Sequence, residues 1–108
     1  MILTVLKEIE DLFKKKQQEY KGETKDNYRN FNQGAMLASE LPQQTLLGYA
    51  EKQVVSLYDA KMNHVDRLND ITFIEEKAKD IALYMIILIA MVRELNTKKR
   101  REDNNATN

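Results

Sequence analysis

The chain has 108 residues, 17 lysines and arginines against 17 aspartates and glutamates, and no cysteine. This length predicts one domain, because a second core would have too few residues. The neutral balance of charge argues against a dedicated nucleic-acid binder, which needs a basic excess to contact phosphates. The lack of cysteine excludes disulfides, a thiol nucleophile and thiolate metal sites.

The sequence predicts neither a membrane span nor a secretory signal. Charged residues interrupt the apolar N-terminus from Lys7 onward, unlike the continuous apolar region of a signal peptide. The longest apolar run, residues 81–92, is shorter than the roughly 20 residues that cross a bilayer. We therefore expect a cytoplasmic protein without a membrane partner.

The first part of the chain predicts one long and one short helix. Apolar residues recur in steps of three and four over residues 2–20, which predicts an amphipathic helix. The polar residues 21–27 predict a loop, with Asn27 as the N-cap of a short helix that docks Tyr28 and Phe31 on the core. The predicted buried face of the first helix consists of Ile2, Val5, Leu6, Ile9, Leu12, Phe13 and Tyr20.

Two further long helices are predicted. Pro42 suits the first turn of a helix, which we expect to end near residue 62 with Leu46, Leu47, Ala50, Val54, Leu57 and Tyr58 buried. Thr72 and Glu75 have capping-box spacing and predict a last helix over residues 73–97. Its predicted buried stripe consists of Ile74, Ala78, Ile81, Met85, Leu88, Val92 and Leu95.

These elements predict an all-α bundle of three long helices and one short helix, in a single domain over residues 1–97. Residues 98–108 are almost wholly polar, and we expect a flexible tail. Its four consecutive basic residues can contact a phosphate or an acidic partner. They can equally end the last helix favourably against its dipole and then fray into solvent.

The last helix also predicts self-association. Residues 81–92 are apolar on every side of the helix, and such a helix must be enclosed. Three other helices in a chain of this size can hardly cover it. We therefore expect a homodimer, or a dimer of dimers, formed through the C-terminal helix.

Acidic residues at the start of the last helix are the candidate metal ligands. Glu76 and Asp80 are four residues apart and share a helical face. Two such carboxylates can bind Mg²⁺ together with waters and a substrate phosphate. Alternatively, Glu75 and Glu76 only stabilise the N-terminal end of the helix dipole. Asp80 fits that alternative less well, because it borders the apolar run.

A polar row on the third helix is the candidate wall of a ligand site. Lys52, Ser56, Asp59 and Asn63 follow one another in steps of four, three and four, so they lie on one face. This row can face Asp80 and Tyr84 across the bundle, or it can be the solvated side of an amphipathic helix.

The segment of residues 27–33 offers a second candidate contact. Tyr28 and Arg29 lie among asparagines, and such side chains can stack on a base and hydrogen-bond its edges. In the alternative interpretation, Tyr28 and Phe31 dock the short helix on the core.

Three segments together resemble small bacteriophage proteins of the nucleotide-modification-associated type. They are YRNFNQGAMLA at residues 28–38, EKQVVSLYD at residues 51–59 and EEKAKDIALYMIILIA at residues 75–90. The resemblance implies a nucleotide or nucleotide-like ligand. The residues implied to bind it are Lys52, Ser56, Asp59, Asp80, Tyr84, Tyr28 and Arg29.

More distantly, the chain resembles the all-α MazG-like nucleotide pyrophosphatases, which are helical dimers or tetramers that use Mg²⁺. In that superfamily an EExxE helix faces an ExxD helix. Here Asp80 can fill the last position, but Lys77 stands three residues before it, and Glu51 lacks the further acids. We therefore expect ligand binding without robust catalysis. The alternative is a phage-encoded interaction protein that inhibits a host enzyme or defence system, and a Mg²⁺-dependent pyrophosphatase is the third interpretation.

Overall fold

The computed structural model describes residues 1–21 and 28–106 of the chain. Its elements, in chain order, are α1 (Ile2–Lys21), α2 (Arg29–Ala38), α3 (Pro42–Asn63), the 3₁₀ helix η1 (Val65–Asn69) and α4 (Ile71–Ala106). These described parts contain no strand, which confirms the all-α class and the order of one short and three long helices. Residues 22–27 of the predicted loop, with the Asn27 cap, lie outside the described residues.

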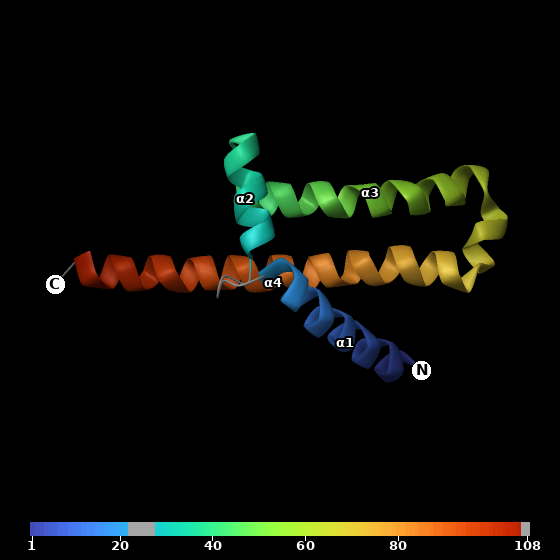
Figure 1. Cartoon of the computed structure of the whole chain (residues 1–108), viewed down its shortest axis with the longest axis horizontal. Helices are drawn as coiled ribbons and strands as arrows, with labels where there is room; N and C mark the ends of the chain where they lie inside the picture. Colours follow the sequence, from blue (N-terminus) through green and yellow to red (C-terminus); the bar gives the residue numbers. More distant parts are fainter. Residues whose placement is uncertain (22–27, 107–108) are drawn as a thin grey trace.

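The helices α3 and α4 run side by side as an antiparallel hairpin, which η1 closes at one end (Figure 1). The short α2 crosses the start of α3 steeply, and α1 crosses α4 obliquely. The molecule measures 61 × 31 × 27 Å, with a radius of gyration of 16.9 Å. A compact domain of this length has a radius of gyration of about 13 Å. The chain is therefore elongated and leaves much of its helical surface uncovered.

The start of α4 corrects the predicted capping box. The Asp70 carboxylate accepts hydrogen bonds from the backbone N–H groups of Thr72 (3.1 Å) and Phe73 (3.3 Å), so Asp70 caps the helix. Thr72 lies inside the first turn, and the Glu75 carboxylate is 3.9 Å from the Lys79 ammonium instead. The prediction was wrong because the carboxylate of Asp70, two residues before Thr72, accepts the hydrogen bonds of the free backbone amides in the first turn.

The end of α4 also differs from the prediction, which placed it near residue 97. The helix continues to Ala106, so residues 98–106 are helical. Lysine, arginine and glutamate are good helix formers even where they pack on nothing. The hydroxyl of Thr97 donates to the backbone carbonyl of Arg93 at 2.9 Å and keeps its side chain on the helix. The apolar spacing therefore indicates which part of a helix can pack against other helices, but not the residue at which the helix ends.

The core lies where α2 packs into the hairpin. Its buried cluster consists of Phe31, Leu46, Leu83, Ile87 and Met91. Phe31 from α2 is 1% exposed. Its ring centroid lies 5.8 Å from that of Tyr49 on α3 and 6.4 Å from that of Tyr84 on α4. These distances are typical of favourable aromatic pairs, so the short helix α2 supplies the residue that joins α3 to α4.

A close approach of α2 to α3 makes this docking possible. Gly34 faces Thr45, and a Cβ atom added at Gly34 would lie only 2.6 Å from the Thr45 methyl carbon. Thr45 is itself buried, and its hydroxyl donates to the Glu40 carboxylate at 2.9 Å. The contact therefore needs glycine at position 34, because Thr45 is held in place.

The buried side of α3 differs in part from the predicted one. Leu46 and Ala50 are buried as predicted, whereas Leu47, Val54 and Tyr58 are exposed. The packed line follows steps of four and three and consists of Leu46, Ala50, Gln53, Leu57 and Ala60. Because this line contains a glutamine and two alanines, the outer side of α3 is as apolar as the inner side. The buried face predicted from the apolar spacing therefore combined residues from both sides of α3.

The predicted stripes of α4 and α1 need the same correction. The most deeply buried residues of α4 are Leu83, Ile87 and Met91, which lie outside the predicted stripe. Seven stripe residues are buried at least in part, namely Val5, Ile9, Leu12, Ile74, Ile81, Met85 and Leu88. Other stripe residues are exposed, namely Ala78, Val92, Leu95, Ile2, Leu6 and Phe13. α4 is apolar on every side, so the packing of its neighbours decides which side is buried. The side chain of Tyr20 lies outside the described residues.

Candidate functional site

Asp80 sits where three helices meet. Its Oδ1 atom lies 3.1 Å from the Lys16 ammonium of α1, and the side-chain amide of Gln53 on α3 donates to its Oδ2 atom at 3.4 Å. The side chains of Lys16 and Asp80 are each 21% exposed. Both carboxylate oxygens thus have partners within the chain, and the residue ties α1, α3 and α4 together.

Lysine side chains lie close to the carboxylates at the start of α4. Lys79 lies 2.8 Å from the Glu8 carboxylate of α1, and this hydrogen bond raises the pKa of Lys79 above its usual value. Glu76 is largely exposed, with its nearest cation, Lys77, at 3.8 Å. Within residues 1–21 and 28–106, no group of three or more acidic, histidine or cysteine side chains converges. The predicted Mg²⁺ ligands Glu76 and Asp80 therefore have no third protein ligand there.

These contacts predict that two carboxylates one helical turn apart contribute differently to the free energy of unfolding. We expect Asp80→Asn to lower the free energy of unfolding by about 1–2 kcal/mol, because it leaves the half-buried Lys16 without its counterion. Glu76→Gln should change it by less than about 0.5 kcal/mol, because that side chain is solvated. Urea unfolding of both variants, with and without Mg²⁺, provides the measurement. Stabilisation by Mg²⁺ that either variant abolishes would instead support the metal site.

The polar row of α3 is confined to its own helix. The Ser56 hydroxyl donates to the backbone carbonyl of Lys52 at 3.1 Å, and the Asp59 carboxylate accepts from the Asn63 amide at 2.9 Å. Gln53, which the sequence reasoning missed, is the α3 residue that reaches Asp80. A signal for it existed, because Gln53 continues the four-and-three spacing of the buried line.

The remaining predicted ligand residues lie in other places. The ring of Tyr84 is part of the aromatic core, with its centroid 6.4 Å from that of Tyr49. Tyr28 precedes α2 and lines a groove with Met91 and Lys98, and Arg29 is the first residue of α2. The seven residues predicted to hold one ligand are therefore not gathered around one cavity.

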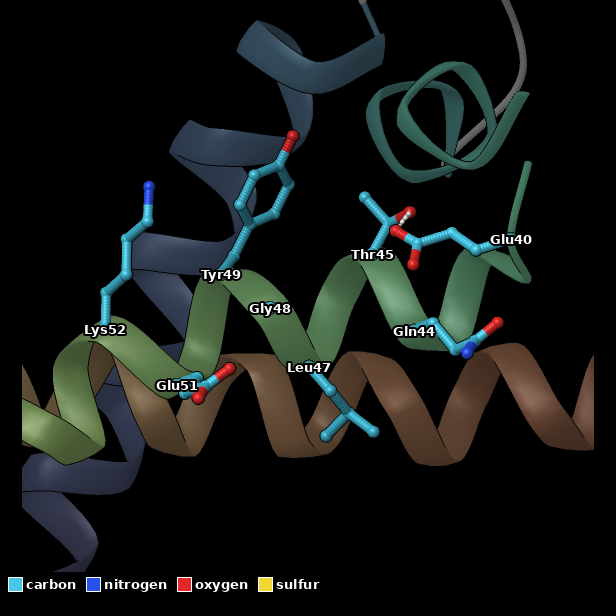
Figure 2. A pocket seen from close by; sticks show the side chains of 8 residues that line it. All are labelled: Glu40, Gln44, Thr45, Leu47, Gly48, Tyr49, Glu51 and Lys52. Carbon is cyan, nitrogen blue, oxygen red and sulfur yellow. Dashed lines mark hydrogen bonds between the residues drawn. The ribbon is translucent and has the colours of Figure 1, made fainter. Parts of the chain in front are cut away.

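The recess beside Lys52 contains one residue of the predicted set. It has a volume of about 580 Å³, and the residues that line it are Glu40, Gln44, Thr45, Leu47, Gly48, Tyr49, Glu51 and Lys52. Figure 2 shows Tyr49 and Lys52 projecting from one side of α3, and Leu47 from the other side, in the direction of α4. All lining residues come from one stretch of chain, so the recess is a feature of one helix surface and not a cleft between elements.

Exposed apolar side chains lie together on the hairpin. On α3 they follow the row that contains Leu47, Val54 and Tyr58, one residue beyond the buried Leu46, Gln53 and Leu57. On α4 they follow a row one residue beyond Tyr84, Leu88 and Met91. We call the two rows the outer face; its residues are Leu47, Val54, Tyr58, Ala78, Ala82, Met85, Ile89 and Val92.

Both rows of the outer face lie on the same side of the hairpin. Seen from one end of an antiparallel pair, the two chains turn in opposite senses. The residue that follows a facing residue therefore points to the same side of the pair on both helices. The other side of α4 carries α1, and Ile87, Ala90 and Phe13 line a cavity of about 410 Å³ there. Ile89 is 55% exposed and Leu47 is 46% exposed. The exposed Glu51 lies between Leu47 and Val54 in the α3 row. Exposed apolar side chains gathered in this way are typical of an interaction site.

Comparisons of the chain with models of protein families, with curated proteins and with solved structures find no match. The resemblance to phage nucleotide-modification-associated proteins and to MazG-like enzymes therefore stays a prediction. In the described part of the chain, none of the helices combines the length and the hydropathy needed to cross a membrane.

Proposed function

We propose that this chain is a helical interaction protein and that its working form is a homodimer joined through the outer face. The observation that carries the proposal is the set of exposed apolar side chains on both helices of the hairpin: Leu47, Val54 and Tyr58 on α3, and Ile89 and Val92 on α4. The row on α4, residues 78, 82, 85, 89 and 92, follows steps of four and three. This is the spacing by which one helix packs along another. The buried line of α3 has the same spacing, so the hairpin has packing rows on both its inner and its outer side.

The energy available from this surface is of the size that association needs. Full burial of a large apolar side chain contributes roughly 1.5–3 kcal/mol, and about half of that remains to be gained for side chains such as Ile89 and Leu47. Two copies together would bury twelve large side chains of the outer face. The free energy gained by burying these side chains exceeds the lower values in the range of roughly 4–15 kcal/mol that association costs. Two hairpins stacked in this way form a four-helix bundle.

Nucleotide binding receives less support from the geometry. The side chains that the resemblance implies are divided among the core, the Asp80 junction, the recess beside Lys52 and the start of α2. Asp80 and Tyr84 are used in packing. An interaction surface needs none of them, so we place this function first and keep nucleotide binding as a prediction.

A charged residue in the outer face tests the proposal. We expect wild-type protein at micromolar concentration to have the mass of a dimer in light scattering. We expect Ile89→Glu to weaken dimerisation at least about 100-fold, because the carboxylate would be buried without a partner. Leu37→Glu is the matched control, since Leu37 is 90% exposed on α2 and lies outside the outer face.

Circular dichroism would show that both variants keep their helices. A strictly monomeric wild-type protein would refute the proposal, and so would a dimer that Leu37→Glu breaks and Ile89→Glu leaves intact.

A further inference from the structure

The two ends of the hairpin differ in length and in charge. At the open end, Pro42 at the start of α3 lies beside Met91 and Leu95 of α4, whereas α4 continues to Ala106. The last turns of α4 therefore project beyond the hairpin (Figure 1). This projection begins with four consecutive cations, Lys98, Lys99, Arg100 and Arg101, all of them exposed. Among the residues that the structure describes, none of the four lies within 4.0 Å of a carboxylate.

The closed end of the hairpin has the opposite charge. Residues 66–76, which span most of η1 and the first turn of α4, contain one cation, Arg67, against the carboxylates of Asp66, Asp70, Glu75 and Glu76. All five side chains are exposed. A basic projection at one end and an acidic turn at the other are complementary between two copies that point in opposite directions.

We propose that the two copies pair with their α4 helices antiparallel, so that the basic projection of each copy lies against the acidic turn of the other. This inference rests on the proposed homodimer and adds its direction. A second copy is the occupant that fits, because the same chain carries both halves of the charge pattern.

The outer row of α4 matches itself in this direction. In an antiparallel pair of helices, an a position of the heptad on one helix lies opposite a d position on the other. Ala82 of one copy then lies opposite Met85 of the other, and Ala78 lies opposite Ile89. A small residue thus meets a large one at these two levels, as efficient packing requires, while Val92 of one copy lies level with Glu75 of the other. The same register places Lys98, the first residue of the basic projection, level with Asn69 at the end of η1, next to Asp70.

The alternative stacking has α4 packed on α3 of the other copy, with the two α4 helices parallel. That arrangement buries the same outer faces. However, it gathers both basic projections at one end of the bundle and both acidic turns at the other, and like charges side by side repel. The charge pattern therefore decides between two arrangements that the apolar surface alone allows.

Cross-linking distinguishes the two arrangements, because the chain has no cysteine of its own. We would prepare Ala78→Cys and Ile89→Cys separately, confirm dimers by light scattering, and treat each variant and their mixture with a short bismaleimide linker. We expect the covalent dimer in the mixture and only traces with either variant alone. Leu37→Cys, outside the outer face, should not cross-link.

If each variant of a dimeric preparation cross-links with itself and the mixture offers no advantage, the antiparallel arrangement is overturned while the homodimer stands. A wild-type chain that is monomeric removes the homodimer itself. Salt provides a second test, because exposed charges are screened within about 10 Å at 0.1 M salt. Raising the salt from about 0.05 M to about 0.5 M should weaken the antiparallel dimer several-fold, whereas a dimer with parallel α4 helices would become tighter.

Discussion

Replacing Leu46 by alanine is expected to lower the free energy of unfolding by about 2–5 kcal/mol. Leu46 is 0% exposed and belongs to the buried cluster with Phe31 and Leu83. The substitution removes three side-chain carbons from the point where α2, α3 and α4 meet. The expected cost includes the lost burial and the cavity that remains, because neighbours on three helices cannot all collapse into it.

Leu47→Ala is the matched control, since it changes the same side chain at the next position. Leu47 belongs to the outer face, so we expect its replacement to cost the folded monomer less than about 1 kcal/mol and to weaken dimerisation instead. Urea unfolding at several protein concentrations separates the two effects, because only a contribution from the dimer depends on concentration. Equal losses for the two variants, independent of concentration, would contradict the assignment of inner and outer sides to α3.

The two helical glycines of α2 and α3 are expected to respond to alanine with opposite signs. Alanine favours a helix over glycine by about 1 kcal/mol. At Gly48 nothing lies within 4 Å of an added Cβ atom, so Gly48→Ala should gain this energy and raise the melting temperature by about 4–8 °C. At Gly34 the added carbon would lie 2.6 Å from the Thr45 methyl group. Overpacking of this kind costs about 1–3 kcal/mol. After subtraction of the helix gain, we expect a net loss of up to about 2 kcal/mol.

A double variant identifies the cause of the loss at Gly34. Thr45→Ser removes the methyl group that the new carbon would meet and keeps the hydroxyl that donates to Glu40. Gly34→Ala combined with Thr45→Ser should therefore be more stable than the sum of the single variants predicts, by more than about 0.5 kcal/mol. Thermal unfolding followed by circular dichroism measures all four variants. Strict additivity would show that the close approach of α2 to α3 is not what makes Gly34 necessary.

The sites show where sequence reasoning reached its limit. The sequence singled out Asp80, at the edge of the apolar run, as a candidate ligand. Its partner Lys16 is 64 residues away in the chain, and no local spacing connects the two. The spacing of Lys52, Ser56 and Asp59 correctly placed them along one row, but spacing does not say what a row faces. Gln53, one residue from Lys52, faces Asp80 instead.

The sequence by itself determined the positions of the four α-helices up to residue 97, because apolar spacing, Pro42 and the scarcity of glycine are local properties. It also indicated that α4 has more apolar surface than one chain can cover. Only the tertiary structure decided which side of each helix is buried. On α3 and α4 the apolar residues lie on two sides, so local pattern leaves the choice open. The docking of Phe31 and the close contact of Gly34 with Thr45 bring α2 to one side of the hairpin, α1 joins it there, and the outer face remains uncovered.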